Sequence, residues 1–513
     1  MTPSSLTVIM KCMKSVKSSE ARPEVKVTGG VMLGKYRKTR SNKRFSSFTR
    51  IPYARPPLGQ LRFAKPVPAE PWDGVLDASK PCPKPVQNNY VTGLLEGQED
   101  CLYINVYKPE CEEGEEEKEE RLPVMFWLYG GGFIMGGKSD REDIITTLQY
   151  EMCSDASEEN YLPGPLLDTG EVIIVTGNYR VGPLGFMCLE DDVMPGNLAL
   201  WDQREMLVWV QENISQFGGD PGNVTVFGNS AGSFCSLSLY TSPECHGLFH
   251  RVIAQSGPLS SNSAPMQVMG KKPSLYARTY AESLGCEASD SSQQILDKLR
   301  QLPVSKLQSS FNIAGSWADM VPSPWKPIVD SWASRPFLPS DPRQAILAGQ
   351  FNKVPLVTGV CSEEGIMMVS HIVREPERWG LLAQTDWWKH FLEIAFHIHP
   401  EDASQQDKAM MMEICQLYDI VPRNFDSDLL ITANSSKVEK KELLTKMIAM
   451  YTDAYFKVGT LDTAQIVASQ QVPVFQYRFG HPVYPLNHKL TVTHQVCLRR
   501  GVEVCGPVDD VRQ

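Results

Sequence analysis

The chain has 513 residues, of which 42% are hydrophobic and 21% charged, and its formal net charge is −10. This is ordinary globular composition with enough apolar material for a large buried core. It excludes two classes of protein: no basic stripe marks a nucleic-acid partner, and no apolar run approaches the ~18 residues of a transmembrane segment.

The first 22 residues predict a disordered N-terminal extension. Their short apolar patch, residues 6–10, is followed closely by lysines. The segment lacks the basic start, long apolar centre and cleavage site of a signal peptide. The chain as written is therefore expected to be cytoplasmic, and extracellular if its N-terminus is incomplete. No linker or repeat divides the remainder, so residues 23–513 are predicted to form a single domain.

Residues 110–120 concentrate the acidic charge. They hold eight glutamates and one lysine, a net charge of −7, which leaves −10 − (−7) = −3 for the rest of the chain. A run of like charges repels itself and stays solvated. We therefore interpret it as an extended loop insertion and not as a binding site.

The hydrophobic pattern predicts an α/β sheet with parallel strand pairs, because strands alternate with helices. Residues 124–128 and 172–175 are apolar runs without alternation, which is typical of strands covered on both faces. The other predicted elements are a helix over residues 198–216, a strand over 223–227, a small-residue helix from 231, strands over 354–358 and 472–479, and a helix over 440–456.

Residues 228–232 read Gly-Asn-Ser-Ala-Gly between a predicted strand and a predicted helix. A serine on a sharp strand-to-helix turn occupies strained backbone, and small residues two positions before and after it let the neighbouring elements approach. The helix below would direct free N–H groups and its positive dipole end toward a developing oxyanion. A tight structural turn is the alternative interpretation of the same five residues.

Three glycines, residues 130–132, follow the buried strand at 124–128. Glycines allow backbone N–H groups to point into a cavity, as an oxyanion hole requires, and each such donor is worth roughly 3–4 kcal/mol in the transition state. A flexible glycine loop is the alternative. It fits less well because large apolar residues, Tyr129 and Phe133, bracket the run.

Several segments in a fixed order resemble the type-B carboxylesterases, the cholinesterase-like family of α/β-hydrolases. The resemblance covers the chain from about Pro23 to its end and implies the α/β-hydrolase fold, a mostly parallel central sheet with helices on both faces. It is carried by residues 51–54, 71–75, 99–106, 178–186, 217–232 and 253–257.

The resemblance implies a role for individual residues. Ser230 would be the nucleophile, and Gly131, Gly132 and Ala231 would supply the oxyanion-hole N–H groups. Glu364 matches the triad acid, since the family places the acid directly before a glycine. Its neighbour Glu363 fits less well, and an exposed glutamate pair is the alternative. Cys82 and Cys101 resemble the family's first disulfide pair.

The sequence does not show the histidine base of this triad. In the late motif of the family, alignment on Asp509 and Asp510 puts Pro507 at the histidine position, and alignment on Cys505 puts Gly506 there. Neither residue can accept a proton. The nearby histidines, at 481, 488 and 494, are interpreted as surface-loop residues rather than as displaced catalytic bases. Family members also continue with helical sequence, so the C-terminus is expected to be incomplete, misassembled or diverging.

Two functions remain in view. The first is an active hydrolase that cleaves small carboxylic esters through an acyl-enzyme; the second is a catalytically impaired, cholinesterase-like protein with a binding or adhesion role. The retained serine, glycines and acid favour the first. Cholinesterases stack a quaternary ammonium on a tryptophan between their first bridging cysteines. Residues 83–100 contain none, which favours a general or lipophilic ester over acetylcholine. No metal or organic cofactor is expected, and the oligomeric state stays open.

Overall fold

The computed structural model describes residues 22–480, apart from 40, 90–92, 111–119, 138–163, 260–271, 310–323, 368, 370–403 and 421–436, and also residues 503–505. The expected N-terminal extension lies outside the described residues except for Arg22, and so does most of the acidic run. The described part of the chain contains no helix that is both long and apolar enough to cross a membrane.

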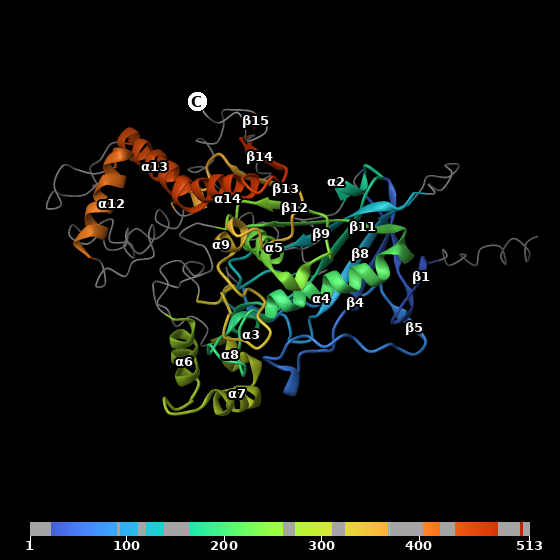
Figure 1. The fold of residues 1–513 in the computed structure, drawn as a ribbon. Helices are drawn as coiled ribbons and strands as arrows, with labels where there is room; N and C mark the ends of the chain where they lie inside the picture. Colours follow the sequence, from blue (N-terminus) through green and yellow to red (C-terminus); the bar gives the residue numbers. More distant parts are fainter. Residues whose placement is uncertain are drawn as a thin grey trace, which may run out of the picture.

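A ten-stranded sheet forms the centre of the molecule (Figure 1). Six neighbouring strands, β14-β13-β12-β11-β9-β10, are parallel, and antiparallel strands extend the sheet at both ends. In spatial order the strands are β15 (Glu503–Cys505), β14 (Val474–Phe479), β13 (Leu356–Cys361), β12 (Arg251–Gln255), β11 (Gly219–Asn229), β9 (Leu122–Leu128), β10 (Ile173–Gly177), β8 (Tyr103–Pro109), β4 (Arg44–Pro52) and β3 (Lys35–Lys38).

Helices cover both faces of the sheet. Successive residues of β10 show this directly: Ile173 and Val175 join the main core, whereas Ile174 joins a separate cluster with Leu167 of α2 on the opposite face. The complete burial of β10 confirms the interpretation of its apolar run. The helices are α2 (Gly164–Leu167), α3 (Gly182–Phe186), α4 (Leu198–Asn213), α5 (Ala231–Thr241), α6 (Pro273–Ser283), α7 (Ser292–Gln301), α8 (Val304–Ser309), α9 (Pro342–Leu347), α12 (Gln405–Leu417), α13 (Lys437–Thr452) and α14 (Val458–Ala468).

Smaller elements surround this framework. In Figure 1, α6, α7 and α8 gather at the lower edge of the view, and α12 and α13 lie beyond one end of the sheet. The short strands are β1 (Glu24–Val27), β2 (Gly30–Leu33) and β5 (Val75–Asp77) in a three-stranded sheet, and β6 (Gln87–Asn88) with β7 (Leu95–Glu96) in a hairpin. Single turns of 3₁₀ helix occur at Gly59–Leu61, Ile214–Phe217 and Pro243–Cys245, and a π-helical turn at Asp453–Lys457.

The parallel register places the carboxyl ends of four strands together. Leu128 of β9 pairs with Gly228 of β11, and Asn229 pairs with Gln255 of β12. Gln255 in turn pairs with Gly359 of β13. Ligands of open α/β sheets bind in the crevice beyond such carboxyl ends. The segments that follow these strands carry the predicted nucleophile, the predicted oxyanion-hole residues and the predicted triad acid.

Candidate active site

Ser230 occupies a strained turn between β11 and α5, with φ +54° and ψ −122°. A non-glycine residue in such backbone costs about 1–3 kcal/mol and persists only where its surroundings hold it. Here the Ser230 N–H donates to the Gln255 carbonyl at 2.8 Å. Serine is a favoured helix N-cap, yet this side chain makes no capping bond to α5. Its half-buried hydroxyl is therefore not used to stabilise the helix.

The two glycines that flank Ser230 are required by close backbone approach. A Cβ atom at Gly228 would lie 2.4 Å from the Gly232 carbonyl oxygen. A Cβ atom at Gly232 would lie 2.1 Å from the Leu128 carbonyl oxygen and 2.7 Å from that of Tyr129. The start of α5 thus rests directly on the end of β9. The spacing of the motif follows from this contact, as the sequence predicts.

Three backbone N–H groups that follow the neighbouring strands β9 and β11 have no hydrogen-bond partner within the described residues. Two belong to Gly131 and Gly132, which follow β9 with φ values of +115° and +60°. The third belongs to Ala231, the first residue of α5, where helices leave their N–H groups unsatisfied. Donors without partners beside a nucleophile are the arrangement that stabilises an oxyanion.

A pair of stacked tyrosines fixes the start of the glycine loop. The rings of Tyr129 and Tyr179 lie 4.1 Å apart and within 6° of parallel. Each hydroxyl donates to the other residue's carbonyl, at 2.7 Å from Tyr129 and 2.6 Å from Tyr179. Both side chains are fully buried, and burial raises the pKa of both hydroxyls well above its usual value. They therefore remain neutral donors.

The loop after Tyr179 is tied to α4 by a buried ion pair. The Arg180 guanidinium contacts both carboxylate oxygens of Asp202, at 2.8 and 2.7 Å, and the two side chains are 4% and 0% exposed. A third guanidinium donor reaches the Ala64 carbonyl at 2.7 Å. Gly182 then donates its N–H to Phe133, directly after the glycine run. The glycine loop is thus supported from the neighbouring strand as well.

Glu364 lies in the turn after β13, at the same edge of the sheet. Its Oε1 accepts the Cys361 N–H at 2.8 Å. Burial raises the pKa of Glu364, and the Ser256 side chain and the Cys361 N–H oppose the rise. The hydrogen bond from Cys361 holds Glu364 in the turn, which is unlike the exposed glutamate pair considered as an alternative.

The glycine after Glu364 has a packing function. A Cβ atom at Gly365 would lie 2.2 Å from the Ile448 carbonyl oxygen, and the Gly365 N–H donates to the Thr452 hydroxyl at 2.9 Å. Both contacts are with α13. The acid-glycine sequence therefore lets the turn dock against this helix while the carboxylate faces the sheet edge.

Ser256 is a residue of the site to which the sequence alone did not assign a role. It follows β12 with φ +54°, is 6% exposed, and donates its N–H to Gly359 at 2.9 Å. Its side chain lowers the pKa of Glu364, and the adjacent Gln255 accepts the Ser230 N–H, so Ser256 lies between the serine turn and the acid. The only signal in the sequence was its place in a family segment.

The described part of the chain does not bring a histidine to this edge. It contains two of the nine histidines, His246 and His250. His250 precedes β12 and accepts the Val224 N–H, so it lies about 16 Å away at the opposite end of that strand. The histidines at 481, 488 and 494, and residues 506 and 507, lie outside the described residues. The antiparallel strand β15, Glu503–Cys505, ends immediately before residues 506 and 507.

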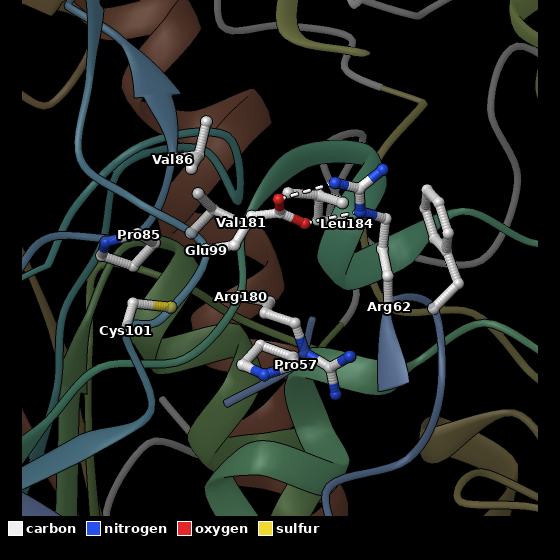
Figure 2. A pocket seen from close by; sticks show the side chains of 10 residues that line it. Pro57, Arg62, Pro85, Val86, Glu99, Cys101, Arg180, Val181 and Leu184 are labelled. Carbon is white, nitrogen blue, oxygen red and sulfur yellow. Dashed lines mark hydrogen bonds and ion pairs between the residues drawn. The ribbon is translucent and has the colours of Figure 1, made fainter. Parts of the chain in front are cut away.

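Cys82 and Cys101, the predicted disulfide pair, are both buried. Both are 1% exposed, and Cys82 contributes to raising the pKa of the Cys101 thiol, after burial as the main cause. The structure holds both as thiols, so the disulfide stays a prediction. Cys101 lines a cavity of about 10 Å³ together with Arg62 and Glu99, an ion pair whose closest atoms are 2.6 Å apart. Figure 2 shows these side chains.

Comparison with known proteins agrees with this geometry. The sequence model described as "Carboxylesterase family" matches residues 21–496. A juvenile hormone esterase of Tribolium castaneum is 36% identical over 366 residues, which are 70% of this chain and 57% of the relative. Esterase FE4 of Myzus persicae is 30% identical over 478 residues, 93% of this chain and 76% of the relative.

A bacterial relative extends the same pattern. The para-nitrobenzyl esterase of Bacillus subtilis is 34% identical over 333 residues, 62% of this chain and 59% of the relative. This chain thus spans less than two thirds of two of these three relatives. The family match nevertheless covers the sheet except for β15, together with the serine turn, the glycine loop and the turn of Glu364. The chain belongs to the carboxylesterase family, and its fold is that of the α/β-hydrolases.

Proposed function

We propose that this protein hydrolyses carboxylic esters, with Ser230 as the nucleophile. One observation carries the proposal: a strained serine, its hydroxyl not engaged in capping, lies beside three N–H groups that have no partner among the described residues. The hydroxyl oxygen attacks the ester carbonyl, and the carbonyl oxygen becomes an anion that Gly131, Gly132 and Ala231 stabilise.

The reaction then proceeds in two halves. The tetrahedral intermediate expels the alcohol, which takes the proton that the base removed from Ser230, and leaves an acyl group on the serine. Water attacks this acyl-enzyme and gives a proton to the base, which passes it to the Ser230 oxygen as the bond to the acyl group breaks and the carboxylic acid leaves. Glu364 acts behind the base, where its carboxylate orients the imidazole and stabilises the imidazolium. In this proposal the base is a histidine of the chain outside the described residues.

The preferred substrate in this proposal is a general or lipophilic ester. Residues 83–100 lack the tryptophan on which cholinesterases stack a quaternary ammonium, and this argues against acetylcholine. Two relatives are named for esters of a hormone and of para-nitrobenzyl alcohol, and neither name describes a charged substrate. We also propose that Cys82 and Cys101 form a disulfide under oxidising conditions, which would close the loop they bracket.

Turnover of aryl esters tests the proposal. Purified protein is given para-nitrophenyl acetate and butyrate, and butyrylthiocholine is the charged comparison. We expect steady release of para-nitrophenol, which Ser230→Ala abolishes, and a lower kcat/KM for the choline ester. Thermal unfolding shows that the variant is folded. Wild-type protein that is folded and releases no more product than Ser230→Ala would overturn the assignment.

A further inference from the structure

The buried amide side chain of Gln87 reaches into the loop that carries the oxyanion glycines. Gln87 lies in β6 and is 3% exposed. Its Oε1 accepts the N–H of Gly136 at 2.8 Å, while its Nε2 donates to the carbonyl oxygen of the same residue at 2.5 Å. One side chain thus satisfies both backbone polar groups of Gly136. These contacts also settle the orientation of the amide, since the reversed one would satisfy neither group.

Gly136 is positioned to transmit this contact to the glycine run. It has φ +122°, and a Cβ atom there would lie 2.3 Å from the Tyr129 ring. Its neighbour Met135 donates its N–H to the Gly131 carbonyl at 3.1 Å, and a Cβ atom at Gly131 would lie 2.3 Å from the Met135 carbonyl oxygen. The loop folds back on itself so closely that Gly136 cannot shift without moving Gly131.

The segment that presents Gln87 is itself firmly held. Pro83 and Pro85 restrict its backbone, since proline fixes φ and lowers the entropy of the alternative conformations. The Asn178 amide donates to the Pro83 carbonyl at 2.7 Å and to the Cys82 sulfur at 3.3 Å. Figure 2 shows Pro85 and Val86, the residues directly before Gln87, against the small cavity. The backbone segment that carries the Gln87 side chain is therefore held rigidly.

We propose that Gln87 is a positioning residue of the oxyanion hole: its amide clamps Gly136 and thereby sets the direction of the Gly131 and Gly132 N–H groups. This inference rests on the proposed function. Oxyanion donors act only when aimed at the developing charge, and a displacement of about 1 Å near the chemistry can cost about 10²-fold in rate. Loss of the clamp should therefore lower kcat and leave KM nearly unchanged.

The test compares Gln87→Met, which keeps the length of the side chain and removes both hydrogen bonds, with Asn88→Ala as the matched control. Asn88 is the next residue of β6, and its side chain donates instead to the Gln308 carbonyl at 3.3 Å. We expect kcat to fall about 10- to 100-fold for Gln87→Met, with KM within about threefold of wild type, and no such change for the control.

Two further readouts separate positioning from general damage. A trifluoromethyl ketone adds to the serine and places an oxyanion in the hole, so its affinity should fall in parallel with kcat/KM. Hydrogen exchange of peptide 129–137 should accelerate in Gln87→Met while exchange of the α4 peptide is unchanged. If Gln87→Met does not fold, Gln87→Glu, which keeps the acceptor for the Gly136 N–H, takes its place with the same expectations.

The outcomes distinguish this inference from the proposed function. An active wild type whose folded Gln87 variant keeps its kcat and its ketone affinity would overturn the positioning role alone. An inactive wild type would overturn the proposed function, and the exchange measurement would still decide whether Gln87 holds the loop. Unchanged exchange over 129–137 would contradict the clamp in either case.

Discussion

A methyl group at Gly232 tests the close contact on which the serine turn depends. The added Cβ would lie 2.1 Å from one backbone oxygen of β9 and 2.7 Å from the next. Non-bonded heavy atoms normally lie ~3.5 Å apart, so α5 or the end of β9 must move by about 1 Å. Overpacking of this kind costs about 1–3 kcal/mol, whereas alanine in a helix gains ~1 kcal/mol over glycine. Because both oxygens belong to the backbone and cannot rotate away, we take the upper cost of about 3 kcal/mol. After subtraction of the ~1 kcal/mol gain from alanine, we expect Gly232→Ala to lower the free energy of unfolding by about 2 kcal/mol.

The same displacement should reach the chemistry. Gly232 presses on Leu128 and Tyr129, directly before the oxyanion glycines, and a 1 Å shift there corresponds to a fall of about 100-fold in kcat. Urea unfolding gives the free energy, and aryl ester turnover gives the rate. Gly164→Ala in α2 is the control, since among the described residues its Cβ would meet only the Thr39 Cβ, at 3.9 Å. If Gly232→Ala is as stable as this control and retains wild-type kcat, the reasoning from backbone approach is refuted.

Three other changes have expected outcomes. Glu364→Gln should lower kcat by about 10³- to 10⁴-fold. The free energy of unfolding of this variant at pH 7 should equal or exceed that of wild type, because burial raises the Glu364 pKa and the ionised carboxylate therefore disfavours folding. This gain in stability should shrink as the pH falls through the Glu364 pKa. A gain that grows as the pH falls would contradict the direction of the pKa shift. Ser256→Ala removes a hydroxyl that lowers the same pKa, so the acid limb of kcat/KM should move to higher pH, and an unmoved limb counts against this influence of Ser256 on Glu364. Asp202→Ala leaves the Arg180 guanidinium buried without its carboxylate and should cost about 3–5 kcal/mol in urea unfolding; a loss below ~1 kcal/mol would show that the pair is not structural.

The parallel half of the sheet could be predicted because its strands are uniformly apolar and end in motifs of fixed spacing. The predicted strands at 354–358 and 472–479 begin slightly later in the structure, at Leu356 and Val474. Both starts follow a proline, Pro355 and Pro473, and proline has no N–H to give to a ladder. The pattern located these strands, and the backbone chemistry of proline set their first residues.

Helix ends were harder to predict than helices. The helix predicted over residues 198–216 is α4 to Asn213 and then a 3₁₀ turn that Gly218 terminates with φ +80°. The helix predicted over 440–456 begins at Lys437, and after Thr452 its last residues form a π-helical turn. Apolar spacing hardly differs between these helical forms over a single turn. Tertiary contacts decide among them, and these are not visible in a local pattern.

The antiparallel side of the sheet and the support of the site were not predicted. Strands β3, β4 and β8 do not have the uninterrupted apolar runs of β9 and β10, and neither does β12, a parallel strand that the pattern also missed. Ser256 and Gln87 carry no local signal, since each acts through a partner more than forty residues away in the chain. The serine turn was predictable because its whole geometry lies within five residues. Its supports come from separate loops that only the fold brings together.

The modification of Ser230 by a fluorophosphonate tests the central claim most directly, because this reagent reports on an activated serine without requiring turnover. The purified protein is treated with a fluorophosphonate probe, digested, and mapped by mass spectrometry. The proposed mechanism predicts stoichiometric labelling of the peptide that contains Ser230, abolished by Ser230→Ala and slowed by Glu364→Gln. A folded wild-type protein in which Ser230 stays unlabelled, or in which another residue takes the label, would contradict it.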